Sequence, residues 1–234
     1  MNDVESPANN MYEELFIDAE KRGGEFFIPY TPKAKCLKML SSKKEQMIRN
    51  RGLVMLVEWY RFETFRNKGI FEQAKCDELI GIITDFAWKH PKPGFEIGEM
   101  FGREGASSEK YGDYASALKF YKASLGFQVS DPRLRYFRIN NLGFCLNFFK
   151  KFEEAEEFLR AATAMVPERY NAWKNLGVTL EHQKKYEEAA ECYMKAIECS
   201  RGEPRSVCHF RRLLVRQPAL AEKYPDIQDE EESQ

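Results

Sequence analysis

The sequence lacks a long hydrophobic run. Its longest apolar stretch, residues 53–57, is far shorter than the roughly 18 residues that a membrane-spanning helix requires. The first residues carry neither the basic segment nor the apolar segment of a secretion signal, so we expect no signal peptide. These two absences predict a cytoplasmic protein that does not cross a membrane.

Residues and spacings that support catalysis or metal binding are also scarce. The three histidines, His90, His182 and His209, are widely separated, and no phosphate-binding loop, nucleophile elbow, zinc-protease motif or calcium loop is present. None of the six cysteines forms a C-x-x-C pair, so we expect reduced thiols and no bound metal. The sequence therefore predicts a protein that is not an enzyme and needs no cofactor.

The chain has little net charge. Its 36 basic and 37 acidic residues give a net charge of −1, so no overall field attracts nucleic acid or an anionic membrane. Charge is nevertheless uneven near the C-terminus. Residues 205–216 contain several arginines, whereas the segment from Asp226 onward is acidic and contains no lysine or arginine.

What the sequence does contain is one motif written twice, 34 positions apart. Leu142 and Gly143 recur as Leu176 and Gly177, and small or aromatic residues recur at the same interval downstream. The further pairs are Phe152 with Tyr186, Ala155 with Ala189, Leu159 with Tyr193, and Ala162 with Ala196. A self-match at a fixed period of this length is typical of a helical repeat array.

The motif resembles the tetratricopeptide repeat, with Trp173 at the start of the better copy. A weaker earlier copy contains Phe101, Gly105, Tyr114, Ala117, Tyr121 and Ser124. Its residues lie 38 rather than 34 positions before their equivalents in the next copy, and we expect the extra residues to form a loop at 127–132. The resemblance implies an all-α fold, a right-handed superhelical array of antiparallel helix hairpins. We expect a repeat domain at 94–203, with repeats at about 97–130, 135–168 and 169–202.

The segments on either side of the repeats do not follow the motif. Residues 1–93 predict an N-terminal helical region with a helix at 11–22, an extended apolar segment within 25–40, and helices at about 42–67 and 71–89. The last two form a hairpin that serves as a cap or a divergent repeat. Residues 204–224 predict a capping helix with an extension, and 225–234 an acidic, disordered tail that we hypothesise folds back onto the capping helix.

In tetratricopeptide arrays, the first helix of each hairpin lines a concave groove. Asparagine amides there can pair with a peptide backbone, phenylalanines offer apolar contacts, and cationic side chains bind carboxylates. Alternatively, Phe137, Phe144 and Phe148 are buried against the first repeat. The resemblance places the following candidate binding residues in the groove: Phe137, Asn140, Asn141, Phe144, Phe148, Asn171, Lys174, Asn175, His182, Arg205 and Arg212.

Some members of the family clamp the C-terminal carboxylate of a chaperone tail with five polar side chains. Asn175 and Arg205 match two of these places. Asn140, Phe144 and His209 stand where the clamp has lysine, asparagine and arginine, so the sequence disfavours this ligand.

The leading hypothesis is a non-enzymatic adaptor that binds a peptide or helical segment of a partner protein in the groove. One alternative is a helper subunit or small enzyme with a site near Tyr30, Trp59 and His90. A weaker alternative is nucleic-acid binding through the arginines of the basic capping helix. Association of identical chains through the open ends of the array is compatible with each of these.

Overall fold

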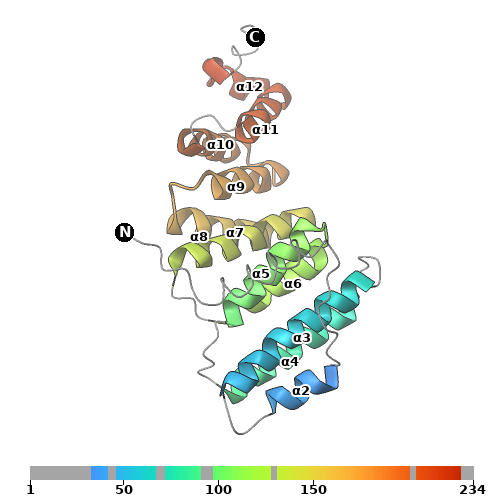
Figure 1. Cartoon of the computed structure of the whole chain (residues 1–234). Helices are drawn as coiled ribbons and strands as arrows, with labels where there is room; N and C mark the ends of the chain where they lie inside the picture. The colour runs from blue at the N-terminus through green and yellow to red at the C-terminus, as the bar shows by residue number, and fades with distance from the viewer. Residues whose placement is uncertain are drawn as a thin grey trace, which may run out of the picture.

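A computed structural model describes residues 33–41, 46–66, 72–90, 97–127, 131–200 and 204–227. Within these ranges the chain is helical, and the helices stack in chain order from α2 to α12 (Figure 1). This arrangement confirms the predicted all-α array of helix hairpins. The predicted helix at 11–22, the apolar segment before residue 33 and the acidic residues from 228 onward lie outside the described ranges.

The helices before the repeats are α2 (Lys33–Leu40), α3 (Gln46–Arg66) and α4 (Gln73–Lys89). The three hairpins that follow pair α5 (Ile97–Lys110) with α6 (Tyr114–Leu125), α7 (Pro132–Phe148) with α8 (Phe152–Met165), and α9 (Tyr170–His182) with α10 (Tyr186–Ser200). The chain continues through α11 (Pro204–Arg216), α12 (Pro218–Ala221) and a 3-10 turn at Pro225–Ile227.

In each repeat hairpin, one glycine of the first helix lets the second helix pack closely against it. At the three equivalent positions, a methyl group added to the glycine would lie 2.5–2.7 Å from a large side chain of the second helix. A β-carbon at such a distance would clash, so only glycine permits this approach of the two helices. The pairs are Gly105 with Tyr121, Gly143 with Leu159, and Gly177 with Tyr193. The first repeat, weak in sequence, is therefore built like the other two.

The turns between paired helices are also equivalent. Gly112, Lys150 and Lys184 have φ angles of 79°, 58° and 63°, in the left-handed region. Each donates its backbone N–H to a carbonyl at the end of the first helix, at 2.9–3.0 Å. This conformation ends the first helix and starts the second within three residues. Glycine adopts it without strain in the first repeat, whereas the other two repeats hold a lysine there.

The segment between the first two repeats differs from the prediction. The sequence indicated a loop over 127–132 and a second repeat from about 135, but α7 already begins at Pro132. The carboxylate of Asp131 accepts a hydrogen bond from the backbone N–H of Arg133 at 2.8 Å, which caps the helix. Proline suits the first helical position because its missing N–H has no partner there anyway.

Helix α2 was also not predicted. The two prolines at 29 and 32 favour extended backbone for themselves and the residues before them, but they do not restrain the residues that follow. Helix α2 packs closely on α3 at Gly52, where an added methyl group would lie 3.0 Å from Met39 Cβ and 3.1 Å from the Leu40 nitrogen. Cys36 and Leu40 are buried in this contact, so α2 covers the start of the array.

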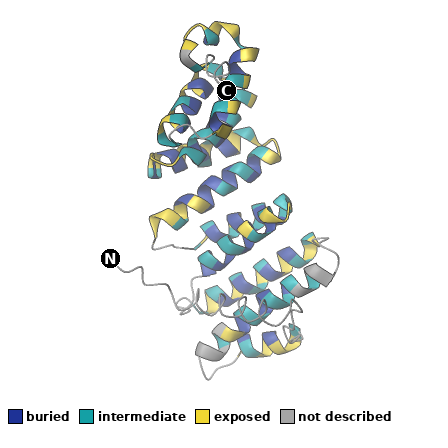
Figure 2. Cartoon of the chain, turned by 45° about the horizontal axis from the view of Figure 1, so that its top comes forward, coloured by how far each residue is buried: buried dark blue, intermediate teal, exposed yellow. Residues whose placement is uncertain are grey.

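Two apolar cores meet at α6. Phe120 belongs to the core that α2, α3, α4 and α5 share, whereas Ala117 and Tyr121 belong to the core that continues to α12. Buried residues accordingly lie on the sides of the helices that face other helices (Figure 2). The hairpin of α3 and α4 is thus packed directly on the first repeat.

A partly buried ion pair crosses the same junction. Glu104 of α5 is almost fully buried and accepts hydrogen bonds from Arg61 of α3, one of them at 3.1 Å from Nε. Burial raises the pKa of the Glu104 carboxyl, and the nearby Arg61 guanidinium opposes that rise. Removing Arg61 alone would leave a buried carboxylate without its main partner.

Helix α11 closes the other end of the array. Phe210, Leu213 and Leu214 are buried, and Tyr224 packs edge-on against Phe210 with ring centroids 5.1 Å apart.

Among the described helices, none combines the length and apolar composition needed to cross a membrane.

We expect Gly143→Ala to lower the free energy of unfolding by about 1–3 kcal/mol, because the new methyl group overlaps Leu159. Gly81→Ala is the matched control. Gly81 lies exposed in α4 with no atom within 4 Å of an added methyl group, so alanine should stabilise the helix by up to about 1 kcal/mol. Urea unfolding followed by circular dichroism measures both. Equal stability of Gly143→Ala and the native chain would contradict the close packing.

Candidate functional site

The first helices of successive hairpins contact one another. Helix α5 contacts α7, α7 contacts α9, and α9 contacts α11. Three of these helices, α7, α9 and α11, carry the residues predicted to line a groove. We call the shared surface of all four helices the first-helix face: the candidate residues predicted from sequence, together with Glu109, Asn147, Val178 and Glu181.

A chain of side-chain hydrogen bonds crosses the first-helix face from the third repeat to the first. The Asn175 amide donates to Asn140 Oδ1 at 3.1 Å, and the Asn140 amide donates to Asn141 Oδ1 at 2.9 Å. The Asn141 amide donates to the Tyr121 hydroxyl at 3.0 Å, and this hydroxyl donates to Glu109 at 2.9 Å. Burial raises the pKa of the Glu109 carboxyl, and the Tyr121 hydrogen bond partly offsets this. Each group in the chain donates to the next one, and the Glu109 carboxylate is the final acceptor.

This hydrogen-bond chain revises the predicted role of two residues. Asn140 and Asn175 are only 5% and 6% exposed, and their amides bond to each other. They therefore do not offer free amide groups to a peptide. They hold α7 against α9, which fixes the surface above them. Asn141 is half-buried and remains within reach of a ligand.

The second repeat has its own polar arrangement. In the first and third repeats a tyrosine of the second helix donates to a glutamate of the first, as Tyr193 does to Glu181 at 3.0 Å. In the second repeat, leucine and asparagine replace this pair. Asn147 instead donates to the Asn175 carbonyl at 3.1 Å and accepts from the Thr179 hydroxyl at 2.8 Å. The paired exchange can be seen in the sequence once the repeats are aligned, because Asn147 and Leu159 stand 34 positions before Glu181 and Tyr193.

The predicted phenylalanines are neither fully buried nor isolated. Phe144 is half-buried with its ring 5.9 Å from that of Tyr114, and Phe148 lies 4.2 Å from the same ring yet is 57% exposed. Phe137 is 41% exposed, and the Arg169 guanidinium lies 5.6 Å from its ring centroid. The structure thus places Phe144 and Phe148 against the first repeat, while two of the three rings stay accessible.

The remaining candidates lie towards the C-terminal end of the first-helix face. His182 is exposed and stacks on Phe152, with ring centroids 4.5 Å apart and planes within 9°. Asn171 and Lys174 are half-buried, and Arg205 and Arg212 are exposed. The basic candidates, Lys174, Arg205 and Arg212, therefore all lie on α9 and α11.

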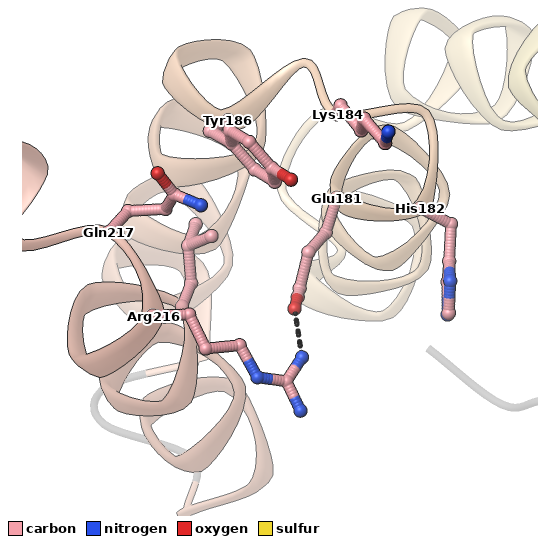
Figure 3. Close-up of a pocket in the computed structure, with 7 residues that line it drawn as sticks. Glu181, His182, Lys184, Tyr186, Arg216 and Gln217 are labelled. Carbon is pink, nitrogen blue, oxygen red and sulfur yellow. Dashed lines mark hydrogen bonds and ion pairs between the residues drawn. The ribbon is translucent and has the colours of Figure 1, made fainter.

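A pocket of 190 Å³ lies where α9, α10 and α11 meet (Figure 3). Arg216 donates to Glu181 at 2.8 Å across it. Most of the lining residues were absent from the candidates predicted by sequence. They are Glu181, His182, Lys184, Tyr186, Leu213, Arg216 and Gln217.

The described residues contain no group of three or more histidine, cysteine, aspartate or glutamate side chains that could hold a metal ion. All six cysteines are free, and four are buried. Burial raises the pKa of the Cys145 and Cys192 thiols to about 12, and that of Cys76 to about 11. These three thiols are therefore protonated at neutral pH and serve as small apolar side chains.

The structure weakens the alternative sites. Two residues in clamp positions already contact other residues of the protein. Asn175 donates a hydrogen bond to Asn140, and His209 stacks on Tyr193 with ring centroids 5.9 Å apart. In the N-terminal region, His90 packs on Phe86 at 4.7 Å, while Tyr30 lies outside the described residues. Of the capping-helix arginines, Arg211 donates to the Ile227 carbonyl at 2.9 Å and Arg216 binds Glu181.

Comparison with known proteins agrees with the repeated hairpin geometry. Residues 170–201, which span α9 and α10, match the family model described as Tetratricopeptide repeat. The chain therefore contains a tetratricopeptide repeat at residues 170–201. No curated protein matches the sequence.

Solved structures resemble this chain at low sequence identity. PilW, a type IV pilus biogenesis factor, is 16% identical with a TM-score of 0.50, and the match covers 98% of this chain and 96% of PilW. MamA from Desulfovibrio magneticus RS-1 is 22% identical with a TM-score of 0.49, covering 76% and 96%. The first repeat domain of Spaghetti, solved with an HSP90 peptide, is 22% identical with a TM-score of 0.46, covering 53% and 94%. The PilW likeness shows the fold.

We expect Asn175→Ala to destabilise the protein by about 1–3 kcal/mol, because it leaves the buried Asn140 oxygen without its donor. Asn171→Ala removes an amide from the same helix at a half-buried position and should change stability by less than about 0.5 kcal/mol. Urea unfolding of both variants checks the difference. Equal losses would show that the hydrogen-bond chain does not support the face.

Proposed function

We propose that this tetratricopeptide repeat protein is a non-enzymatic adaptor that holds a short segment of a partner protein against its first-helix face. The observation that supports this most directly is a pair of exposed aromatic rings on α7. Phe137 and Phe148 are 41% and 57% exposed on the surface that carries the buried amide chain. Exposed aromatic side chains on a rigid surface favour protein binding, because covering them removes apolar area from water.

Both rings are held in place before any partner arrives. Tyr114 packs against Phe148 at 4.2 Å, and Arg169 lies over Phe137 at 5.6 Å. The amide chain beneath them fixes α7 against α9. A partner segment therefore meets ordered side chains, and little conformational entropy is lost on the side of the adaptor.

The charges on the face indicate the chemistry of the segment. Lys174, Arg205 and Arg212 lie on α9 and α11, beyond the aromatic rings of α7. A complementary segment carries an apolar residue for the α7 rings and acidic residues towards α11. Its binding should weaken as the salt concentration rises, since exposed charge pairs are screened.

Selection of 12-residue peptides from a displayed random library tests the proposal. We expect the selected peptides to combine apolar and acidic residues, and Phe137→Ala/Phe148→Ala to weaken their binding at least 10-fold, the loss of a central aromatic contact. Trp88→Ala is the control, because Trp88 is an 82% exposed aromatic residue on α4, away from the first-helix face. Fluorescence anisotropy measures the affinities.

Two results would refute the proposed site. One is equal affinity of the native chain and the double variant for the selected peptides. The other is a loss on Trp88→Ala as large as that on the double variant, which would place the binding surface on the N-terminal hairpin.

A further inference from the structure

A row of stacked side chains follows the edge where the first helices end. The first residue of each second helix is aromatic, and the last turn of the next first helix places a side chain beside it. In the first step Tyr114 lies 4.2 Å from Phe148, and in the second step Phe152 lies 4.5 Å from His182. The third step brings Tyr186 beside Arg216 as lining residues of the 190 Å³ pocket.

The third step is open because of Glu181. Arg216 donates to Glu181 at 2.8 Å, and Figure 3 shows its guanidinium turned towards that carboxylate. The other oxygen of Glu181 accepts from the Tyr193 hydroxyl at 3.0 Å. In the first two steps a ring, of Phe148 or of His182, packs against the aromatic residue. In the third step the Arg216 guanidinium binds Glu181 instead, and a pocket lies beside Tyr186.

The pocket is cationic. Lys184 and Arg216 carry two positive charges against the single carboxylate of Glu181, and both oxygens of that carboxylate already accept hydrogen bonds. Lys184 is exposed at the left-handed turn position. Tyr186 and Leu213 supply apolar surface beneath these charges, and Gln217 adds an amide. Such a lining accommodates a short apolar stem that ends in a carboxylate.

We propose that this pocket binds an acidic side chain of the partner segment, with its carboxylate between Lys184 and Arg216 and its methylene groups against Tyr186. The assignment rests on the proposed function and names one residue class of the ligand. Phe148 and Arg216 occupy the last turns of α7 and α11, two helix spacings apart. That separation is roughly 20 Å, or about six residues of extended chain. The segment should therefore carry its acidic residue about six positions from the residue that contacts Phe148.

A pair of synthetic peptides tests the pocket. One is acetylated and amidated Glu-Glu-Leu-Glu-Glu-Glu-Leu, in which the first glutamate and the last leucine are six positions apart, and the other replaces every glutamate with glutamine. Each is titrated into isotope-labelled full-length protein, and backbone amide shifts are followed by NMR. We expect saturable shifts at Lys184, Tyr186, Arg216 and Gln217 with the acidic peptide, and no saturation with its amide counterpart.

Variants separate the pocket from general charge. Lys184→Gln/Arg216→Gln should weaken the acidic peptide at least 10-fold. The control, Lys122→Gln/Lys195→Gln, removes the same charge from exposed sites on α6 and α10 and should stay within twofold. Lys184→Gln alone, at an exposed turn residue, should show part of the loss with an unchanged thermal midpoint. Equal binding by the native chain and the double variant, or equal shifts with both peptides, would overturn the proposal.

The acidic tail of the chain itself is the competing occupant. If deletion of residues 228–234 alone shifts the same four amides, the tail fills the pocket and the assignment to a partner is wrong. The two proposals fail separately. Selected peptides that depend on Phe137 and Phe148 but not on Lys184 and Arg216 would overturn only the pocket. Selected peptides that ignore the two phenylalanines would overturn the proposed function.

Discussion

In each of the three repeats, the two helices approach each other at a glycine of the first helix. Gly105, Gly143 and Gly177 each admit a large side chain of the second helix to a distance that a methyl group would forbid. This contact sets the separation of the paired helices. The left-handed turn residue that follows sets their direction. With both fixed, each hairpin presents the same sides to its neighbours, and the first helices come together into one surface.

Polar contacts then fix the order of that surface. The amide chain from Asn175 to Asn141 ends at a tyrosine and a carboxylate of the first repeat. Each group satisfies the next, so desolvation of the amides is compensated within the protein. The same chain explains why Asn140 and Asn175 are poor candidates for direct peptide contact. In the proposed function, the accessible rings of α7 and the cationic side chains of α9 and α11 contact the partner.

The sequence predicted most of the fold, because small and large residues recur at the positions where the helices of a repeat pack together. It did not reveal α2, since prolines at 29 and 32 mark where extended backbone is favoured but not where a helix begins. It placed Asn140 and Asn175 on the first helices of their hairpins, yet periodicity cannot show that two amides on neighbouring helices face each other. The pocket escaped prediction for a similar reason. It depends on Arg216 turning to Glu181, a contact between residues 35 positions apart.

The proposed function requires that the exposed rings of α7 contact a partner segment. Photo-crosslinking tests this most directly, with p-benzoylphenylalanine placed at position 148 or at position 88 and the crosslinked peptides identified by mass spectrometry. The account predicts crosslinks from position 148 to one defined segment of a partner, with an acidic residue about six positions away, and none from position 88 to that segment. Crosslinks to the segment from position 88 but not from position 148 would contradict it.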